Sequence, residues 1–111
     1  MRFSESLKKN DDFRRVYRKG RSKANQNLVL YVYKNGLDRN RLGVSVSKKV
    51  GNSIVRHHMT RLIREVYRLH EDEFNIGLDL VVVVRRGDKR TKLSEVEPYF
   101  LNLANLQRIM K

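Results

Sequence analysis

The chain has 111 residues, 25 of them Lys or Arg and 12 Asp or Glu, so its formal net charge is +13 at pH 7. This length fits a single domain spanning residues 1–111, and the charge exceeds what solubility requires, which indicates a polyanionic partner. The absence of cysteine excludes disulfides, thiol catalysis and cysteine-based zinc sites. The longest aliphatic run, Leu80–Val84, is too short to cross a bilayer and the first residues form no apolar signal segment, so we expect a cytoplasmic protein without a membrane partner.

The first predicted element is a short helix. Asn10 and the two acids after it predict the helix start, with Asn10 as the cap, and Gly20 predicts the end. Phe13, Val16 and Tyr17 follow the i, i+3, i+4 spacing, so one face of this helix carries aromatic rings.

Strands come next in the chain. Residues 28–34 are rich in strand-forming side chains, and residues 42–47 alternate more cleanly between two faces. The turn signal at Asn35–Gly36 predicts that these two strands form an antiparallel hairpin. A shorter strand is expected at 21–24.

The longest predicted helix begins at Asn52 or Ser53 and ends near His70. At 100° per residue, one face is apolar, and the opposite face places three arginines within about 40° of His57. The apolar residues are Val55, Met59, Leu62, Ile63 and Val66, and the arginines are Arg61, Arg64 and Arg68. Glu65 is the one acid nearby, whereas solvated helices usually mix both signs, so we favour polyanion binding and keep a merely soluble face as the alternative.

The C-terminal third predicts a central strand and a last helix. Residues 80–84 are apolar throughout, as expected of a strand covered on both faces, and this strand could pair in parallel with 42–47. Ser94 and Glu97 resemble a capping box for a helix ending near Met110. The order αβββαβα gives an α+β fold, a small mixed four-stranded sheet with three helices.

The sequence predicts no catalytic residue, no metal ligand and no small-molecule cofactor. The acids at 71–73 end the long helix and are interpreted as a solvated turn. His57 and His58 point about 100° apart on a helix, so they cannot bind one metal together and are interpreted as surface side chains. Gly51–Asn52 is a weak signal for a phosphate-binding loop, and no complete glycine-rich nucleotide motif is present.

Two stretches resemble a known family. Residues 41–56 read Arg-Leu-Gly-Val-Ser-Val-Ser-Lys-Lys-Val-Gly-Asn-Ser-Ile-Val-Arg, followed by Arg61-Leu62-Ile63-Arg64-Glu65. Together they resemble the signature of the bacterial ribonuclease P protein family, and residues 7–25 are also similar to it. The resemblance implies a subunit that binds a catalytic RNA, ribonuclease P RNA, and assists removal of the 5′ leader from precursor tRNA. The catalytic groups and most of the Mg²⁺ would then belong to the RNA.

The resemblance also implies two sets of site residues. A cleft between the first two helices and one sheet face would bind the leader. Spacing alone instead favours a place in the core for the aromatic residues of this cleft. The implied cleft residues are Phe13, Tyr17, Val29 and Tyr31. The implied RNA-backbone contacts are Lys48, Lys49, Asn52, Arg56, His57, Arg61, Arg64 and Arg68.

This chain departs from the family pattern at positions 57, 58 and 60, where it has His, His and Thr. Histidine can supply hydrogen bonds there, with a charge that depends on pH. The resemblance further implies a fold similar to the second domain of ribosomal protein S5, with a left-handed strand–helix–strand crossover. The alternative functions are a ribosomal or other structural RNA-binding protein of the same fold and, third, an autonomous nuclease.

Overall fold

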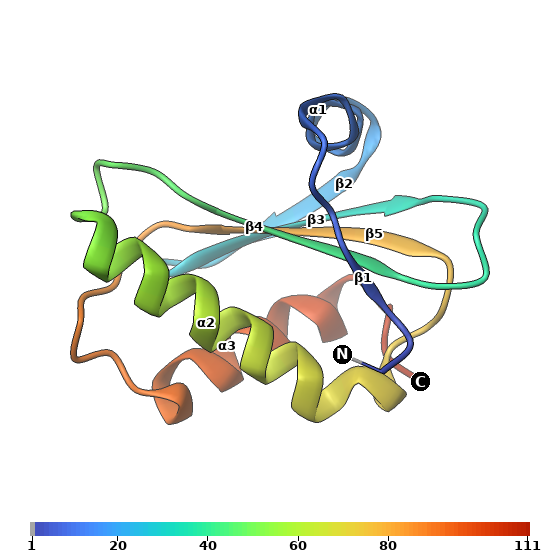
Figure 1. The fold of residues 1–111 in the computed structure, drawn as a ribbon. Coiled ribbons are helices and arrows are strands. Elements are labelled where there is room, and N and C mark those ends of the chain that lie inside the picture. Colours follow the sequence, from blue (N-terminus) through green and yellow to red (C-terminus); the bar gives the residue numbers. More distant parts are fainter. Residues whose placement is uncertain (1) are drawn as a thin grey trace.

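The computed structural model describes residues 2–111 and contains a five-stranded mixed sheet in the order β1-β4-β5-β3-β2. Helix α1 lies on one face of the sheet, and α2 and α3 cover the other face (Figure 1). The elements are β1 Glu5–Ser6, α1 Asn10–Lys19, β2 Arg21–Ala24, β3 Leu28–Lys34, β4 Arg41–Val46, α2 Ser53–His70, the 3-10 turn η1 Glu71–Glu73, β5 Leu78–Val84 and α3 Leu93–Leu106. The α+β class, the three helices and the strand at 21–24 are confirmed.

The predicted hairpin is wrong because β3 and β4 are not neighbours. Strand β5 lies between them, antiparallel to β3 and parallel to β4. The sequence turn reverses the chain but does not select the partner strand. Because residues 80–84 of β5 are apolar on both faces, the central place in the sheet removes most of their surface from water. The parallel pairing of β4 with β5 and the central place of β5 are as predicted.

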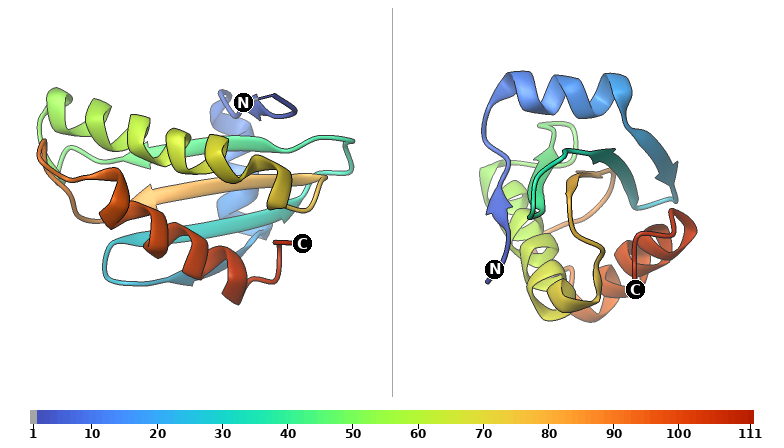
Figure 2. Two further views of the ribbon diagram at one scale, coloured as in Figure 1. Left: turned by 90° about the horizontal axis from the view of Figure 1, so that it is seen from below. Right: turned by 90° about the vertical axis from the view of Figure 1, so that its right-hand side faces the viewer.

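The connection from β4 through α2 to β5 follows a left-handed path. In Figure 1, β4 runs from right to left in front, α2 returns below the sheet, and β5 runs again from right to left behind β4. The view from below in Figure 2 shows the same order of strands. Parallel strands are usually joined by right-handed crossovers. The similarity to the ribosomal protein domain stays a prediction.

The fifth strand, β1, belongs to an N-terminal arm that the sequence did not predict. Its two residues pair in parallel with β4, too short a segment to show alternation. The arm is held by Glu71, whose carboxylate accepts the backbone N–H groups of Arg2 at 2.7 Å and Phe3 at 2.9 Å. Burial raises the pKa of Glu71, but hydrogen bonds from Ser4 and these two N–H groups outweigh it, so the pKa is lowered. The interpretation of Glu71 as part of a solvated turn is therefore wrong.

The helix ends are partly as predicted. Asn52 caps α2, its Oδ1 accepting the Val55 N–H at 3.1 Å. Lys9, and not Asn10, precedes α1, and its side chain makes no capping hydrogen bond. Helix α3 lacks the predicted capping box because it begins at Leu93, which puts Ser94 inside the helix, and the Glu97 carboxylate lies 2.9 Å from Nε2 of His70. That helix also ends at Leu106, before the predicted Met110, because Met110 pairs with Phe74 in an isolated bridge.

Most buried apolar side chains lie between the sheet and the pair α2 and α3. A smaller cluster of Leu7, Val16 and Val81 lies under α1. The sheet face beside α1 is therefore less completely covered than the face beside α2 and α3, and this difference leaves side chains of that face accessible.

Candidate nucleic-acid interface

The exposed side of α2 carries the predicted arginines. Met59, Ile63 and Val66 are buried against the sheet, whereas Arg61 and Arg64 are exposed. We call Arg61, Arg64 and Arg68 the basic face. Within residues 2–111, no ion pair involves Arg61 or Arg64, so their charges are uncompensated.

Arg68 differs from the other two arginines because it pairs with Glu65. Hydrogen bonding to Glu65 raises the pKa of Arg68, and the same contact lowers the pKa of Glu65. The pair leaves Arg68 with less net charge to offer a phosphate than Arg61 or Arg64.

The turn before α2 adds two further cations. Lys48 and Lys49 are exposed. Asn52 is occupied as the helix cap, and Nη1 of Arg56 donates to the Gly51 carbonyl at 3.3 Å. The structure therefore places the lysines where they can contact a ligand, and it uses Asn52 and Arg56 to shape the turn.

His57 and His58 have different environments. His57 is exposed beside Arg61, in a shallow hollow at the start of α2. Nε2 of His58 lies 2.7 Å from the carbonyl oxygen of Thr91. The interpretation of His58 as a surface side chain is therefore wrong, since it joins α2 to the loop before α3.

That loop, residues 85–92, carries cations that the sequence analysis missed. They are Arg85, Arg86, Lys89, Arg90 and Lys92, all exposed. Asp88 is the one acid in the loop, and its carboxylate accepts the Arg90 N–H at 2.7 Å, so it shapes the backbone. The signal was available, because five cations in eight residues between a strand and a helix indicate a polyanion contact.

Aromatic rings meet on the other face of the sheet. The Tyr17 and Tyr31 ring centroids are 5.0 Å apart in an edge-on arrangement, and those of Phe13 and Tyr17 are 6.3 Å apart. We call Phe13, Tyr17, Val29 and Tyr31 the aromatic surface. Tyr17 is 39% exposed, whereas Phe13 packs over Gly43, where an added Cβ would lie 2.6 Å from its ring. Phe13 therefore packs against the sheet and supports the aromatic surface, whereas the Tyr17 ring is exposed and can contact a ligand.

A cleft between the first two helices is not observed, because α1 and α2 lie on opposite faces of the sheet (Figure 1). The aromatic surface is bordered by α1 and the sheet. Val29 pairs with Val83 of β5 at the end of the sheet where β4 and β5 finish. The turn 47–52 and the loop 85–92, which we call the basic loops, follow those two strand ends. The aromatic surface and the basic loops therefore lie at the same end of the sheet.

An ion-pair network holds α1 above the sheet. Asp79 is fully buried, and Arg41 contacts both of its carboxylate oxygens, Nε at 2.8 Å and Nη2 at 2.7 Å. Nη1 of Arg41 is 3.5 Å from Asp12 of α1, which also pairs with Arg15 at 2.9 Å. Hydrogen bonding to Asp79 raises the pKa of Arg41. The network fixes the position of the helix that carries Phe13 and Tyr17.

Within residues 2–111, no group of three or more His, Asp or Glu side chains could hold a metal ion. No helix in the same range combines the length and apolar character needed to span a membrane.

Comparison with known proteins decides the family. The model of the Ribonuclease P family matches residues 1–106. The chain belongs to the ribonuclease P protein family. It is 54% identical to the ribonuclease P protein component of Lachnoclostridium phytofermentans, over 96% of this chain and 92% of the relative. It is 50% identical to that of Clostridium acetobutylicum, over 89% and 85%.

Solved ribonuclease P proteins have the same fold. The protein from Staphylococcus aureus superposes with a TM-score of 0.86 at 34% identity, over 96% of this chain and 97% of that one. The protein from Thermotoga maritima gives 0.80 at 33%, over 94% and 96%. As a ribonuclease P protein component, the chain is part of an endoribonuclease with an RNA partner, and the comparisons favour this function over the ribosomal and autonomous-nuclease alternatives.

Proposed function

We propose that the aromatic surface binds the single-stranded 5′ leader of precursor tRNA. The observation that carries the proposal is the exposed Tyr17 ring beside Tyr31, on the sheet face opposite the basic face. Unpaired bases stack on aromatic rings, whereas bases in a duplex are hidden in the stack. A surface of this kind distinguishes tRNA that carries a leader from mature tRNA.

The basic face and the basic loops bind ribonuclease P RNA through its phosphates. Arg61, Arg64, Lys48 and Lys49 are exposed, and loop 85–92 extends the positive charge around the same end of the sheet. Cations on a helix and its adjoining loops suit backbone contacts that do not depend on sequence. The two ligands then approach opposite faces of one sheet.

Catalysis in this proposal belongs to the RNA. The holoenzyme uses Mg²⁺ held mainly by ribonuclease P RNA, in the cytoplasm, without a small-molecule cofactor, and the protein positions the substrate. Cleavage of precursor tRNA at the mature 5′ end by protein freed of RNA would contradict this assignment.

Site-specific crosslinking in the holoenzyme tests both surfaces at once. A benzophenone amino acid replaces Tyr17 in one variant and Arg64 in another. We expect position 17 to crosslink to nucleotides of the leader and position 64 to ribonuclease P RNA. Crosslinks from position 17 only to ribonuclease P RNA or to the mature part of tRNA would contradict the leader assignment, whatever the result at position 64.

A further inference from the structure

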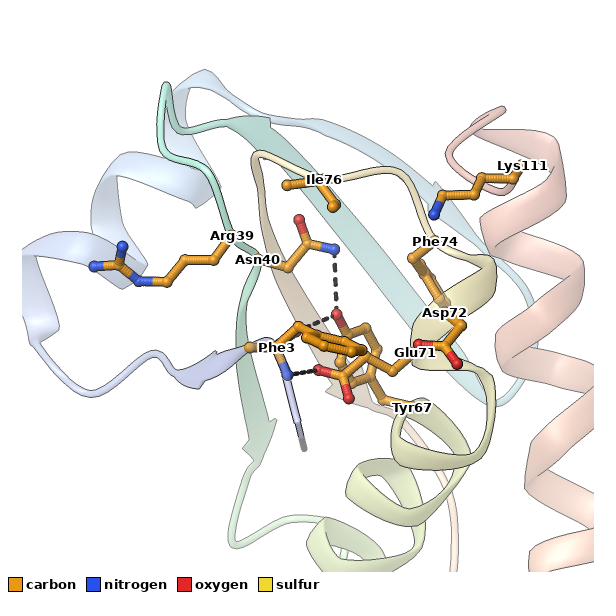
Figure 3. Close-up of a pocket in the computed structure, with 10 residues that line it drawn as sticks. Phe3, Arg39, Asn40, Tyr67, Glu71, Asp72, Phe74, Ile76 and Lys111 are labelled. Atoms are coloured by element: carbon orange, nitrogen blue, oxygen red, sulfur yellow. Dashed lines mark hydrogen bonds between the residues drawn. The ribbon is translucent and has the colours of Figure 1, made fainter.

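A pocket of about 350 Å³ lies at the end of the sheet opposite the basic loops. The N-terminal arm, the end of α2, the segment before β5 and the C-terminal residue converge on it (Figure 3). The side chains that matter for its chemistry are Phe3, Tyr67, Asp72, Phe74, Ile76 and Lys111. We call it the end pocket.

Apolar groups form the floor and two walls of the end pocket. Tyr67 and Phe74 are buried beneath it, whereas Phe3 is 54% exposed and Ile76 is 61% exposed. The backbone at Phe3 is fixed by its hydrogen bond to Glu71, and the Arg2 guanidinium carbon is 5.0 Å from the ring centroid. The backbone that carries the Phe3 ring is therefore held in place, and the ring has a cation over it and is exposed enough to contact a second flat group.

Four charged side chains line the end pocket, and two of them are already engaged: Glu71 accepts the N–H groups of the arm, and Arg39 pairs with Glu5 and Asp38. Asp72 lies in the 3-10 turn η1, which directly follows the end of α2 at His70. Lys111 also lines the pocket, and in Figure 3 Phe74 is drawn between the side chains of Lys111 and Asp72. Within residues 2–111, neither the Asp72 nor the Lys111 side chain has an ion pair or a side-chain hydrogen bond, so both are available to a ligand.

We propose that the end pocket binds one unpaired nucleobase, with guanine preferred, in the RNA that lies along α2. The base stacks on Phe3 and contacts Ile76, and its phosphate is neutralised by Lys111. The Asp72 carboxylate accepts the adjacent N1–H and N2–H groups of guanine. The proposal deepens the proposed function, since it rests on ribonuclease P RNA following the basic face.

The chemistry of the rim predicts which of the four bases the end pocket binds most tightly. Guanine offers two neighbouring N–H donors to one carboxylate, whereas adenine and cytosine offer one amino group. The N–H of uracil lies between two carbonyl oxygens, which repel a carboxylate. The net charge of +13 and the position of the pocket at the end of α2, the helix that carries the basic face, favour a nucleotide over an apolar peptide as the occupant.

Mononucleotide titration of ¹⁵N-labelled protein tests the end pocket directly. The probes are GMP, AMP, CMP, UMP and inorganic phosphate, and the reporters are the backbone amides of Phe3, Asp72 and Ile76. We expect GMP to shift these amides at the lowest concentration. Asp72→Asn should weaken GMP binding about tenfold, the loss of a hydrogen bond to a charged group. The matched variant Asp11→Asn, at an exposed position on α1, should leave GMP binding unchanged.

Several results would overturn the proposal. They are no shift with any nucleotide, equal shifts for all four, equal shifts with phosphate alone, or an unchanged response in Asp72→Asn. Phe3→Ala should also abolish the shifts, with thermal unfolding as its folding control, and the exposed Asp72 provides a variant that does not depend on packing.

The holoenzyme separates this proposal from the proposed function. Asp72→Asn should weaken binding of ribonuclease P RNA while the preference for leader-bearing tRNA stays unchanged. Unchanged affinity for ribonuclease P RNA would overturn the placement of the base in that RNA, even if GMP binds. A holoenzyme of the parent protein that shows no leader preference would contradict the proposed function without bearing on the titration.

Discussion

Gly43 allows α1 to approach the sheet closely. A Cβ at this position would lie 2.6 Å from Cζ and 2.7 Å from Cε1 of Phe13. We expect Gly43→Ala to displace the Phe13 ring and lower the free energy of unfolding by about 1 to 3 kcal/mol, the usual cost of overpacking. Urea denaturation measures the change.

Ser45→Ala is the matched control for Gly43→Ala, because Ser45 lies two residues further along the same face of β4. It should change the unfolding free energy far less. Equal losses in the two variants would show that the contact between Phe13 and Gly43 is not what limits the approach of α1.

His70 joins the end of α2 to α3 and to the turn η1. Nε2 lies 2.9 Å from Glu97 and Nδ1 lies 2.6 Å from Glu73. The hydrogen bond to Glu97, and then that to Glu73, raises the pKa of His70 above its ordinary value of 6.5. A raised pKa in the folded state means that the protonated imidazole stabilises the fold below that ordinary value, and this contribution disappears as pH rises through the folded pKa.

We therefore expect His70→Gln to lower the urea midpoint more at pH 5.5 than at pH 8.5, relative to the parent protein. The two midpoints at each pH give the comparison, with His57→Gln as a control because His57 is exposed and has no carboxylate partner within residues 2–111. A gap between parent and His70→Gln that is the same at both pH values would contradict the charged contact.

Single residues also show where prediction from sequence stops. Helical spacing puts Phe13 and Tyr17 on one face but cannot tell which is covered, because that depends on the glycine opposite Phe13 in β4. The roles of Glu71, Glu97 and His58 each depend on a partner at least 27 residues away in the chain. Local patterns carry no information about such contacts, which explains the errors at Glu71, at the α3 cap and at His58.

The contacts on α2 predict that its three arginines contribute unequally to RNA binding. Arg61→Ala and Arg64→Ala should each reduce the slope of log K against log salt for ribonuclease P RNA, by up to about 0.7 to 0.9 for each phosphate that the variant no longer neutralises. Arg68→Ala should have a smaller effect because Glu65 already compensates its charge. Filter-binding titrations at several salt concentrations and constant Mg²⁺ measure the slopes.

The folding control for these variants is thermal unfolding, which should change little because the arginines lie opposite the buried face. Unaltered salt slopes with intact RNA binding for Arg61→Ala and Arg64→Ala would contradict RNA binding by the basic face. The basic face would then be a merely solvated helix surface.

Elements with a strong periodic pattern were predicted well from the sequence. The 3.6-residue period over α2 gives its length, buried face and exposed face, and the apolar run in β5 gives its central place. Strand pairing was harder because a turn fixes the direction of two strands but not whether a third lies between them. The two-residue strand β1 has too few residues to produce a pattern at all.

The sheet organises the whole molecule into two working surfaces. The aromatic surface lies beside α1 on one face of the sheet, and the basic face lies on α2 at the other. The loops after β4 and β5 bring positive charge to the end of the sheet where these two strands finish. This arrangement allows one small protein to contact two RNA segments simultaneously, one through bases and the other through phosphates.

The selectivity of the holoenzyme for leader-bearing tRNA tests this arrangement most directly. Dissociation constants are measured for precursor tRNA with a leader of several nucleotides and for mature tRNA, using the parent protein, Tyr17→Leu and Tyr31→Leu. Leucine keeps much of the buried area but removes the aromatic ring. Tyr99→Leu is the matched control, because Tyr99 is 40% exposed on α3 below the other face of the sheet.

We expect each of the two test variants to weaken binding of precursor tRNA by about 1 to 3 kcal/mol per unstacked base, roughly fivefold to 150-fold, and to leave mature tRNA nearly unchanged. Tyr99→Leu should alter neither ligand. Equal losses on precursor and mature tRNA, or a loss of stability without any selective loss of precursor binding, would contradict the assignment of the aromatic surface to the leader.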